Sequence, residues 1–213
     1  MVSLYSLSSK LAKYITMEAE FEQDKVDSVR YGMEIILGSL IKGIILLTLA
    51  YLLGILPQVI IALICGSLLR LVSGGAHCTS YLRCISCGSV VYLSIGKAAL
   101  YFESFSSHDQ LAMILTPCFL IMAVSAFLWA PAEVPYRVIR YRESILFKWL
   151  TVSYIILCLT IIFYYEDGIR LSYIMAGVLA LLAQTFSFTP PGYLVIGKID
   201  AFLLYLTSKK GGE

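Results

Sequence analysis

Long uninterrupted apolar runs are the feature of this sequence that most limits its fold. One run extends from Met33 to Leu56, and others follow along the chain. In a bilayer, a run of about 20 apolar residues spans the hydrocarbon core as a helix. Only 14% of the 213 residues are charged, against roughly one quarter in soluble domains. The sequence therefore excludes a water-soluble enzyme and a disordered chain, and predicts an all-α, polytopic membrane protein.

Six apolar segments qualify as membrane spans within a single integral membrane domain over residues 1–213. The second segment is too short to cross alone, unless it extends through Leu71 and Val72 or is re-entrant and shielded by protein. A helical hairpin is expected at Leu56-Pro57-Gln58, because Pro removes a backbone donor and ends the first helix there. The predicted segments are 33–56, 59–69, 85–102, 111–130, 149–165 and 171–188.

A shorter apolar pattern precedes the first span. Apolar residues recur there at helical spacing, with Ser and Lys between them: Leu4, Leu7, Leu11, Tyr14 and Ile15. This pattern predicts an amphipathic helix within residues 1–30. Two arrangements fit it equally well, namely a helix lying in the inner membrane interface and a helix packed on its own loops.

The placement of Lys and Arg predicts the orientation, because loops kept in the cytoplasm carry the excess of basic residues. With the N-terminus inside, Arg170 is in an outer segment, and Lys42 and Lys97 lie within spans. The inner segments then hold the remaining basic residues: Lys10, Lys13, Lys25, Arg30, Arg70, Arg83, Arg137, Arg140, Arg142, Lys148, Lys198, Lys209 and Lys210. Both termini and the loop at residues 70–84 are therefore expected on the cytoplasmic side.

The segment from Arg70 to Cys84, RLVSGGAHCTSYLRC, concentrates the reactive side chains. It contains His77 and Cys84, and a thiol with an imidazole is the minimum for cysteine nucleophilic catalysis. A neighbouring base or positive charge raises the thiolate fraction, and Arg70 and Arg83 are candidates for that charge. Three of the six cysteines instead fall inside apolar runs, where Cys behaves as a small hydrophobe.

The spacing of His77 and Cys84 requires a break in the helix. On one continuous helix they would share a face but lie about 10 Å apart along the axis, whereas proton transfer needs roughly 3 Å. Gly74 and Gly75 supply backbone freedom before His77. Thr79-Ser80 is a suitable cap for a helix that carries Cys84. The sequence therefore predicts a catalytic loop at the membrane surface, followed by a spanning helix.

This segment resembles the accessory gene regulator B family (AgrB-like), membrane cysteine endopeptidases that process peptide pheromone precursors in Gram-positive bacteria. The matching residues are Arg70, the Gly74-Gly75-x-His77 core and Cys84. The resemblance covers most of the chain and includes Tyr31-Gly32-x-Glu34 and Ala130-Pro131-Ala132. Cys78 and Cys87 are additions to the pattern, and only Cys84 matches the position of the family's nucleophile.

The resemblance implies a catalytic pair, Cys84 as nucleophile and His77 as general base, with Arg70, Gly74 and Gly75 in substrate-binding or supporting roles. It implies cleavage of a short precursor peptide through a Cys84 thioester, and ring closure to a thiolactone or lactone quorum-sensing peptide. It implies no cofactor, no metal and no nucleic acid. The expected location is the bacterial plasma membrane, in contact with lipid, and a homodimer is expected by analogy alone.

Two other kinds of site compete with catalysis at this segment. His77, Cys78, Cys84 and Cys87 together offer the four N and S ligands of a structural zinc ion, and Cys84-x-x-Cys87 has the spacing of a redox pair. A different class of function is also open, a polytopic peptide transporter or a peptide-binding membrane protein without proteolytic activity.

Other polar and charged residues are expected to have supporting or structural roles. The loop around His77 contains no acid or amide side chain that could serve as a third catalytic group. Glu34 and Glu133 are distant in the sequence, so only the fold could bring either of them to His77. An oxyanion hole is expected from backbone amides near Gly75 or from the start of the Cys84 helix. Lys97 is expected to extend its amine to the membrane interface, and His108 to be a solvated loop residue. The basic residues at 137, 140, 142 and 148 are expected to set topology and touch anionic lipid.

Overall fold

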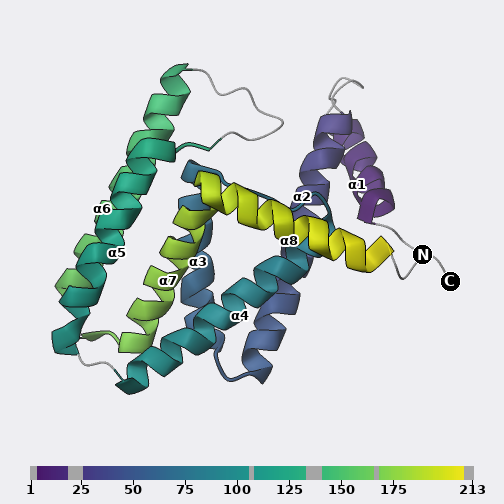
Figure 1. Cartoon of the computed structure of the whole chain (residues 1–213). Coiled ribbons are helices and arrows are strands. Elements are labelled where there is room, and N and C mark those ends of the chain that lie inside the picture. The colour runs from purple at the N-terminus through teal and green to yellow at the C-terminus, as the bar shows by residue number, and fades with distance from the viewer. Residues whose placement is uncertain (1–3, 19–25, 106–107, 133–140, 166–167, 209–213) are drawn as a thin grey trace. The chain divides into compact units, whose positions relative to one another are not determined.

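The computed structural model describes residues 4–18, 26–105, 108–132, 141–165 and 168–208. The regular elements in these ranges are all helices (Figure 1), so the prediction of an all-α fold is confirmed. They are α1 (Leu4–Glu18), α2 (Val26–Leu52), α3 (Leu56–Ser73), α4 (Tyr81–Phe105), α5 (His108–Trp129), α6 (Tyr141–Tyr165), α7 (Leu171–Ser187) and α8 (Pro190–Ser208). His108 is therefore the first residue of a helix, not a loop residue as predicted.

The chain divides into two compact units, Met1–Thr48 and Leu49–Glu213. In the first unit, the guanidinium of Arg30 lies 4.7 Å from the centre of the Tyr5 ring and pairs with Glu34 at 3.0 Å. The predicted N-terminal helix is present as α1. Its apolar side chains Leu7 and Tyr14 are exposed, whereas Leu11 and Ile15 are half-buried, so the choice between the membrane interface and packing on loops stays a prediction.

Membrane-spanning length is reached by four single helices among the described residues: α2, α3, α4 and the part of α6 from Arg142 to Tyr165. The helices α7 and α8 qualify only as a pair, and they are bent by 88° relative to each other. Within α5, Met113–Trp129 is a shorter apolar helix. The protein is thus a multi-pass membrane protein with four candidate spans, or five if the bent pair counts as one.

The second predicted segment is longer than the sequence suggested. Helix α3 has 18 residues and includes Leu71 and Val72, so it is long enough to cross. Helix α2 ends at Leu52, before the predicted break, and Gly54 turns the chain with φ +67°. Pro57 lies in the first turn of α3. Its fixed φ and missing N–H suit a helix start, so it begins the second helix instead of ending the first.

Helix α7 is the most buried helix of the second unit, and it packs against α3, α4, α5 and α8. In Figure 1, α7 (light green) lies beside α3. Small residues allow close approach between these helices. A Cβ added at Gly96 of α4 would come within 2.9 Å of Val59 on α3, and one at Gly177 of α7 within 3.4 Å of the Cys65 sulfur. These close contacts fix the spacing of α4 from α3 and of α7 from α3.

Helix α8 was not predicted. Thr189 precedes it, and its hydroxyl accepts a hydrogen bond from the Gly192 N–H at 3.2 Å. Pro190 and Pro191 follow in the first turn, where a missing N–H costs no helical hydrogen bond. The Pro-Pro pair therefore begins a helix at the sharp bend after α7. Because α8 contacts α4, the bend brings this C-terminal helix toward the Cys84 helix.

Polar contacts identify the two ends of the second unit. At one end, Lys97 Nζ donates to the Leu53 carbonyl at 3.1 Å, and Arg170 pairs with Glu103 at 3.0 Å. The loop of residues 74–80 lies at the other end of α4, beyond Tyr81. The two ends of α4 thus carry different polar groups, and the side of the membrane that each end faces stays a prediction.

Candidate active site

The loop of residues 74–80 breaks the helical path between His77 and Cys84, as the spacing required. Helix α3 ends at Ser73, where the Gly74 N–H donates to the Arg70 carbonyl at 3.0 Å. Gly74 has φ +68° and Gly75 φ +139°. L-amino acids with a side chain rarely adopt these values, so the two glycines make this turn possible.

Space around the two glycines is also restricted. A Cβ at Gly75 would lie 2.5 Å from Ser187 Oγ, and one at Gly74 would lie 2.9 Å from the Ala132 carbonyl oxygen. The Ala132 N–H donates to the Ser73 carbonyl at 2.8 Å, so the segment after α5 also borders this loop. Both glycines are therefore required by conformation and by packing.

Arg70 holds the loop from the α3 side. Its Nη2 donates to the Ala76 carbonyl at 2.6 Å and to the Gly75 carbonyl at 3.5 Å, and its Nη1 donates to Gln184 Oε1 at 2.9 Å. The guanidinium is in addition within electrostatic reach of the Cys84 thiol. The structure thus brings together Arg70, Gly75 and Cys84, three of the residues that the sequence singled out.

Two residues of α7, Gln184 and Ser187, also hold the loop, and neither was predicted from the sequence. Gln184 Nε2 donates to the Gly74 carbonyl at 2.7 Å and to Ser73 Oγ at 3.2 Å. The Ala76 N–H donates to the Ser187 carbonyl at 3.0 Å. One signal was present in the sequence, because an amide side chain inside an apolar run is costly in a membrane and usually has a partner.

Cys84 lies in the first turn of α4, and its N–H donates to the Ser80 carbonyl at 2.9 Å. Ser80 therefore precedes the helix as expected, while the Thr79 hydroxyl bonds elsewhere. The Cys84 side chain is partly buried, and His77 lies on the exposed part of the loop. All six cysteines are free of disulfide bonds.

Cys78 lies in the loop directly after His77. Burial raises the pKa of the Cys78 thiol to about 11, and the neighbouring Cys87, Cys84 and Asp200 add to this effect. A thiol with this pKa is almost entirely protonated at neutral pH and is a poor nucleophile. Cys78 is therefore a poor candidate for a nucleophile at neutral pH.

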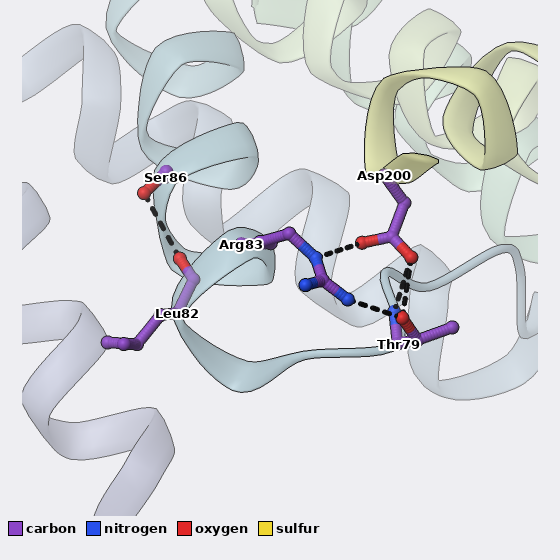
Figure 2. Close-up of polar contacts among 5 residues, drawn as sticks. All are labelled: Thr79, Leu82, Arg83, Ser86 and Asp200. Carbon is purple, nitrogen blue, oxygen red and sulfur yellow. Dashed lines mark hydrogen bonds and ion pairs between the residues drawn. The ribbon is translucent and has the colours of Figure 1, made fainter. Parts of the chain in front are cut away.

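Asp200 of α8 bonds to the start of the Cys84 helix (Figure 2) and was also missed by the sequence analysis. Thr79 donates to its Oδ2 from the backbone N–H at 3.1 Å and from the hydroxyl at 2.6 Å. Arg83 Nε donates to its Oδ1 at 2.7 Å. Of the two arginines proposed to act on the thiol, Arg83 is thus ion-paired with Asp200, and Arg70 is bound to Gln184 and to the loop carbonyls.

The other proposed supporting residues are placed as follows. Glu34 pairs with Arg30 in the first unit, while Glu133, Arg137 and Arg140 lie outside the described residues. In the described part of the chain, no three His, Cys, Asp or Glu side chains are arranged to hold a metal ion. The geometry of His77 and the three nearby cysteines therefore gives no support to a zinc site.

An apolar groove of about 380 Å³ lies between α3 and α6. None of its lining residues is a cysteine or a histidine, so this groove offers no thiol nucleophile of its own. Its lining residues are Leu68, Leu71, Val72, Leu150, Ser153, Tyr154 and Leu157.

These features define a multi-pass membrane protein with a thiol, an imidazole and a fixed guanidinium at one end of its helices. Residues 8–188 match the model of the Accessory gene regulator B family, and the chain belongs to this family. Its role is thus in accessory gene regulator peptide processing.

Two curated relatives from Clostridium perfringens are similar over nearly their whole length. The chain is 25% identical over 209 residues to "Putative AgrB-like protein 2" of strain 13 / Type A. It is 26% identical over 209 residues to "Putative AgrB-like protein" of strain SM101 / Type A. Each alignment covers 92% of this chain and 96% of the relative. No solved structure matches the chain.

Proposed function

We propose that this protein is a membrane-embedded cysteine endopeptidase that removes the C-terminal part of a precursor peptide and promotes cyclisation of the remainder. Cys84 is the nucleophile and His77 the general base. The product is a thiolactone or lactone quorum-sensing peptide. The enzyme acts in the bacterial plasma membrane, with both termini and the loop of residues 74–80 on the cytoplasmic side.

The observation that carries this proposal is the position of Arg70. Its guanidinium is fixed by Gln184 and by the carbonyls of Gly75 and Ala76, directly before His77. A fixed positive charge beside a thiol favours the thiolate, which is the reactive form. Since the charge is held before any substrate arrives, no reorganisation is needed when the thiolate forms.

The reaction has two balanced steps. In the first, the Cys84 sulfur bonds to a precursor carbonyl carbon while His77 accepts the thiol proton. The C–N bond then breaks, and the C-terminal fragment leaves as an amine with that proton. In the second, a Cys or Ser side chain of the bound peptide attacks the thioester carbonyl, closes the ring, and returns its proton through His77 to Cys84.

The energetics explain why the site should restrict water. Forming a thioester from an amide is uphill, so positioning of the peptide and removal of the cleaved fragment must drive the first step. Ring closure to a thiolactone is nearly isoenergetic, and water competes with the internal nucleophile. A loop at the membrane surface limits that competition. The protein contacts the surrounding membrane lipid in this proposal. A homodimer is proposed by analogy with other small membrane enzymes.

The test is the intact mass of the protein in nanodiscs after incubation with the precursor peptide encoded beside its gene. We expect an adduct with the mass of the precursor's N-terminal part, released by hydroxylamine, in the wild-type protein. Cys78→Ala is the matched control, because it removes a thiol from the same loop, and it should keep the adduct. Cys84→Ala should lose both adduct and cleavage.

An uncleaved precursor that nevertheless binds the wild-type protein would overturn the proposal. It would point to the alternative class, a peptide-binding or peptide-transporting membrane protein. Cleavage that persists in Cys84→Ala would overturn the assignment of the nucleophile.

A further inference from the structure

Asp200 lies outside the residues that match the family model, which end at residue 188. It is 7% exposed, and its carboxylate accepts three hydrogen bonds, all from one short segment of the chain. Two come from Thr79 and one from Arg83, and Arg83 Nη2 also donates to Thr79 Oγ1 at 2.6 Å. Figure 2 shows this closed cycle of contacts between α8 and the beginning of α4.

The two partners of Asp200 stand beside the proposed catalytic residues. Thr79 follows His77 and Cys78 directly, and Arg83 immediately precedes Cys84. Because Thr79 and Arg83 are bound to one carboxylate, the turn between the loop that contains His77 and the helix that contains Cys84 is held in place. Hydrogen bonds to an ionised group are shorter and stronger than neutral ones, so this connection is stiff.

We propose that Asp200 is a positioning residue that locks the Thr79–Arg83 turn and thereby sets the placement of Cys84 relative to His77. This proposal rests on the proposed function. Asp200 contacts no reacting atom in it and acts through Thr79 and Arg83. Helix α8, which the sequence did not indicate, is then part of the catalytic framework.

The Asp200 cluster differs from an ordinary surface ion pair. The side chains of Arg83 and Asp200 are 14% and 10% exposed. In the pair of Arg170 with Glu103 at the other end of α4, the corresponding values are 61% and 26%. Exposed pairs are screened by solvent and contribute little. Glu103 lies 19 positions along α4 from Cys84, about 28 Å at the helical rise, so it provides a matched control.

The first experiment measures kcat and KM for precursor cleavage in nanodiscs. We expect Asp200→Asn to lower kcat by about 10-fold to 100-fold, because misplacement of reacting groups by about 1 Å has effects of this size. KM should change less than about threefold, since the peptide-binding surfaces remain. Asp200→Glu keeps the carboxylate and should recover most of kcat. Glu103→Gln should leave both constants unchanged.

The second experiment does not depend on catalysis. The rate of Cys78 alkylation by iodoacetamide at pH 8 is measured by peptide-mapping mass spectrometry. In Asp200→Asn the rate should rise at least threefold, because Thr79 loses an anionic acceptor and a negative charge near the Cys78 thiol is removed. Glu103→Gln should label like the wild type. If Asp200→Asn does not fold, Thr79→Val tests the same connection and should also speed Cys78 labelling.

The results separate the two proposals. Equal kcat values in Asp200→Asn and Glu103→Gln, or unchanged Cys78 labelling in Asp200→Asn, would refute the positioning role. If the proposed function is wrong, the wild-type protein itself does not cleave the precursor. In that case faster Cys78 labelling in Thr79→Val, which keeps the Asp200 charge, would still uphold the lock on the turn, and unchanged labelling in that variant would refute it.

Discussion

At the scale of single residues, Gly75 shows how tightly the candidate site is built. Its φ of +139° is unfavourable for residues with a side chain, and a Cβ would lie 2.5 Å from Ser187 Oγ. The neighbouring carbonyls accept hydrogen bonds from Arg70. Any shift of this glycine therefore also displaces the Arg70 guanidinium that is bound to these carbonyls.

We expect Gly75→Ala to lower both stability and activity. The forced backbone conformation costs on the order of 1–3 kcal/mol, and precursor cleavage should fall by at least about 10-fold because the loop shifts. Thermal unfolding in detergent and cleavage assays measure these effects. Adding Ser187→Gly should restore only part of the stability, since it removes the steric contact but not the backbone strain.

Gly197→Ala is the control for this substitution. Gly197 lies inside α8, with nothing within 4 Å of an added Cβ. Alanine is a better helix former than glycine by up to about 1 kcal/mol, so the variant should be equally or slightly more stable. Equal behaviour of Gly75→Ala and Gly197→Ala would contradict the strained loop described here.

At the scale of elements, α7 organises the site although none of its residues was predicted to be functional. Gln184 links the Arg70 guanidinium to the Gly74 carbonyl and to Ser73 Oγ. A single amide side chain thus connects α7 to the end of α3 and to the glycine loop. The buried Gln58 on α3 is different, because its Oε1 has no hydrogen-bond partner among the residues that the structure describes.

We expect Gln184→Leu to destabilise the protein by about 1–3 kcal/mol, because the Arg70 guanidinium, the Gly74 carbonyl and Ser73 Oγ each lose a hydrogen bond. Gln58→Leu, an equally buried substitution, should have a smaller effect, because the Gln58 side chain makes only one long hydrogen bond, to Ser172 at 3.4 Å. Thermal unfolding of both variants in the same detergent makes the comparison. A larger loss in Gln58→Leu would show that Gln184 does not hold the loop.

At the scale of the whole molecule, the second unit separates its polar groups between two ends. Arg170 and Glu103 lie at one end, while Arg70, the glycine loop and Cys84 lie at the other. The basic residues of the sequence predict that the end with Cys84 faces the cytoplasm. This orientation also decides where the precursor peptide must be delivered.

A cysteine introduced at Gly168 tests the orientation. Gly168 is exposed, and nothing lies within 4 Å of a Cβ there. A membrane-impermeant thiol reagent should label Gly168→Cys in intact cells, and should label Cys84 only after the cells are opened. Labelling of Cys84 but not of position 168 in intact cells would reverse the orientation and, with it, the side on which the substrate is bound.

Much of the fold was predictable because lipid imposes a simple rule. An apolar run must become a helix that satisfies its own backbone, so the sequence correctly predicted helices at the six apolar segments. It placed the boundaries less well, as the early end of α2 and the length of α3 show. Arg70, Gly74, Gly75, His77 and Cys84 stood out by residue type and spacing alone, and their catalytic roles stay predictions.

The sequence by itself determined the class of protein, the helical segments and the residues able to do chemistry, because these depend on local composition and spacing. The tertiary structure decided which groups meet. Gln184 and Asp200 lie more than one hundred positions from their partners, and the 88° bend between α7 and α8 brings the second of them to the Cys84 helix. No local pattern encodes such distant contacts, since they follow from how the helices pack.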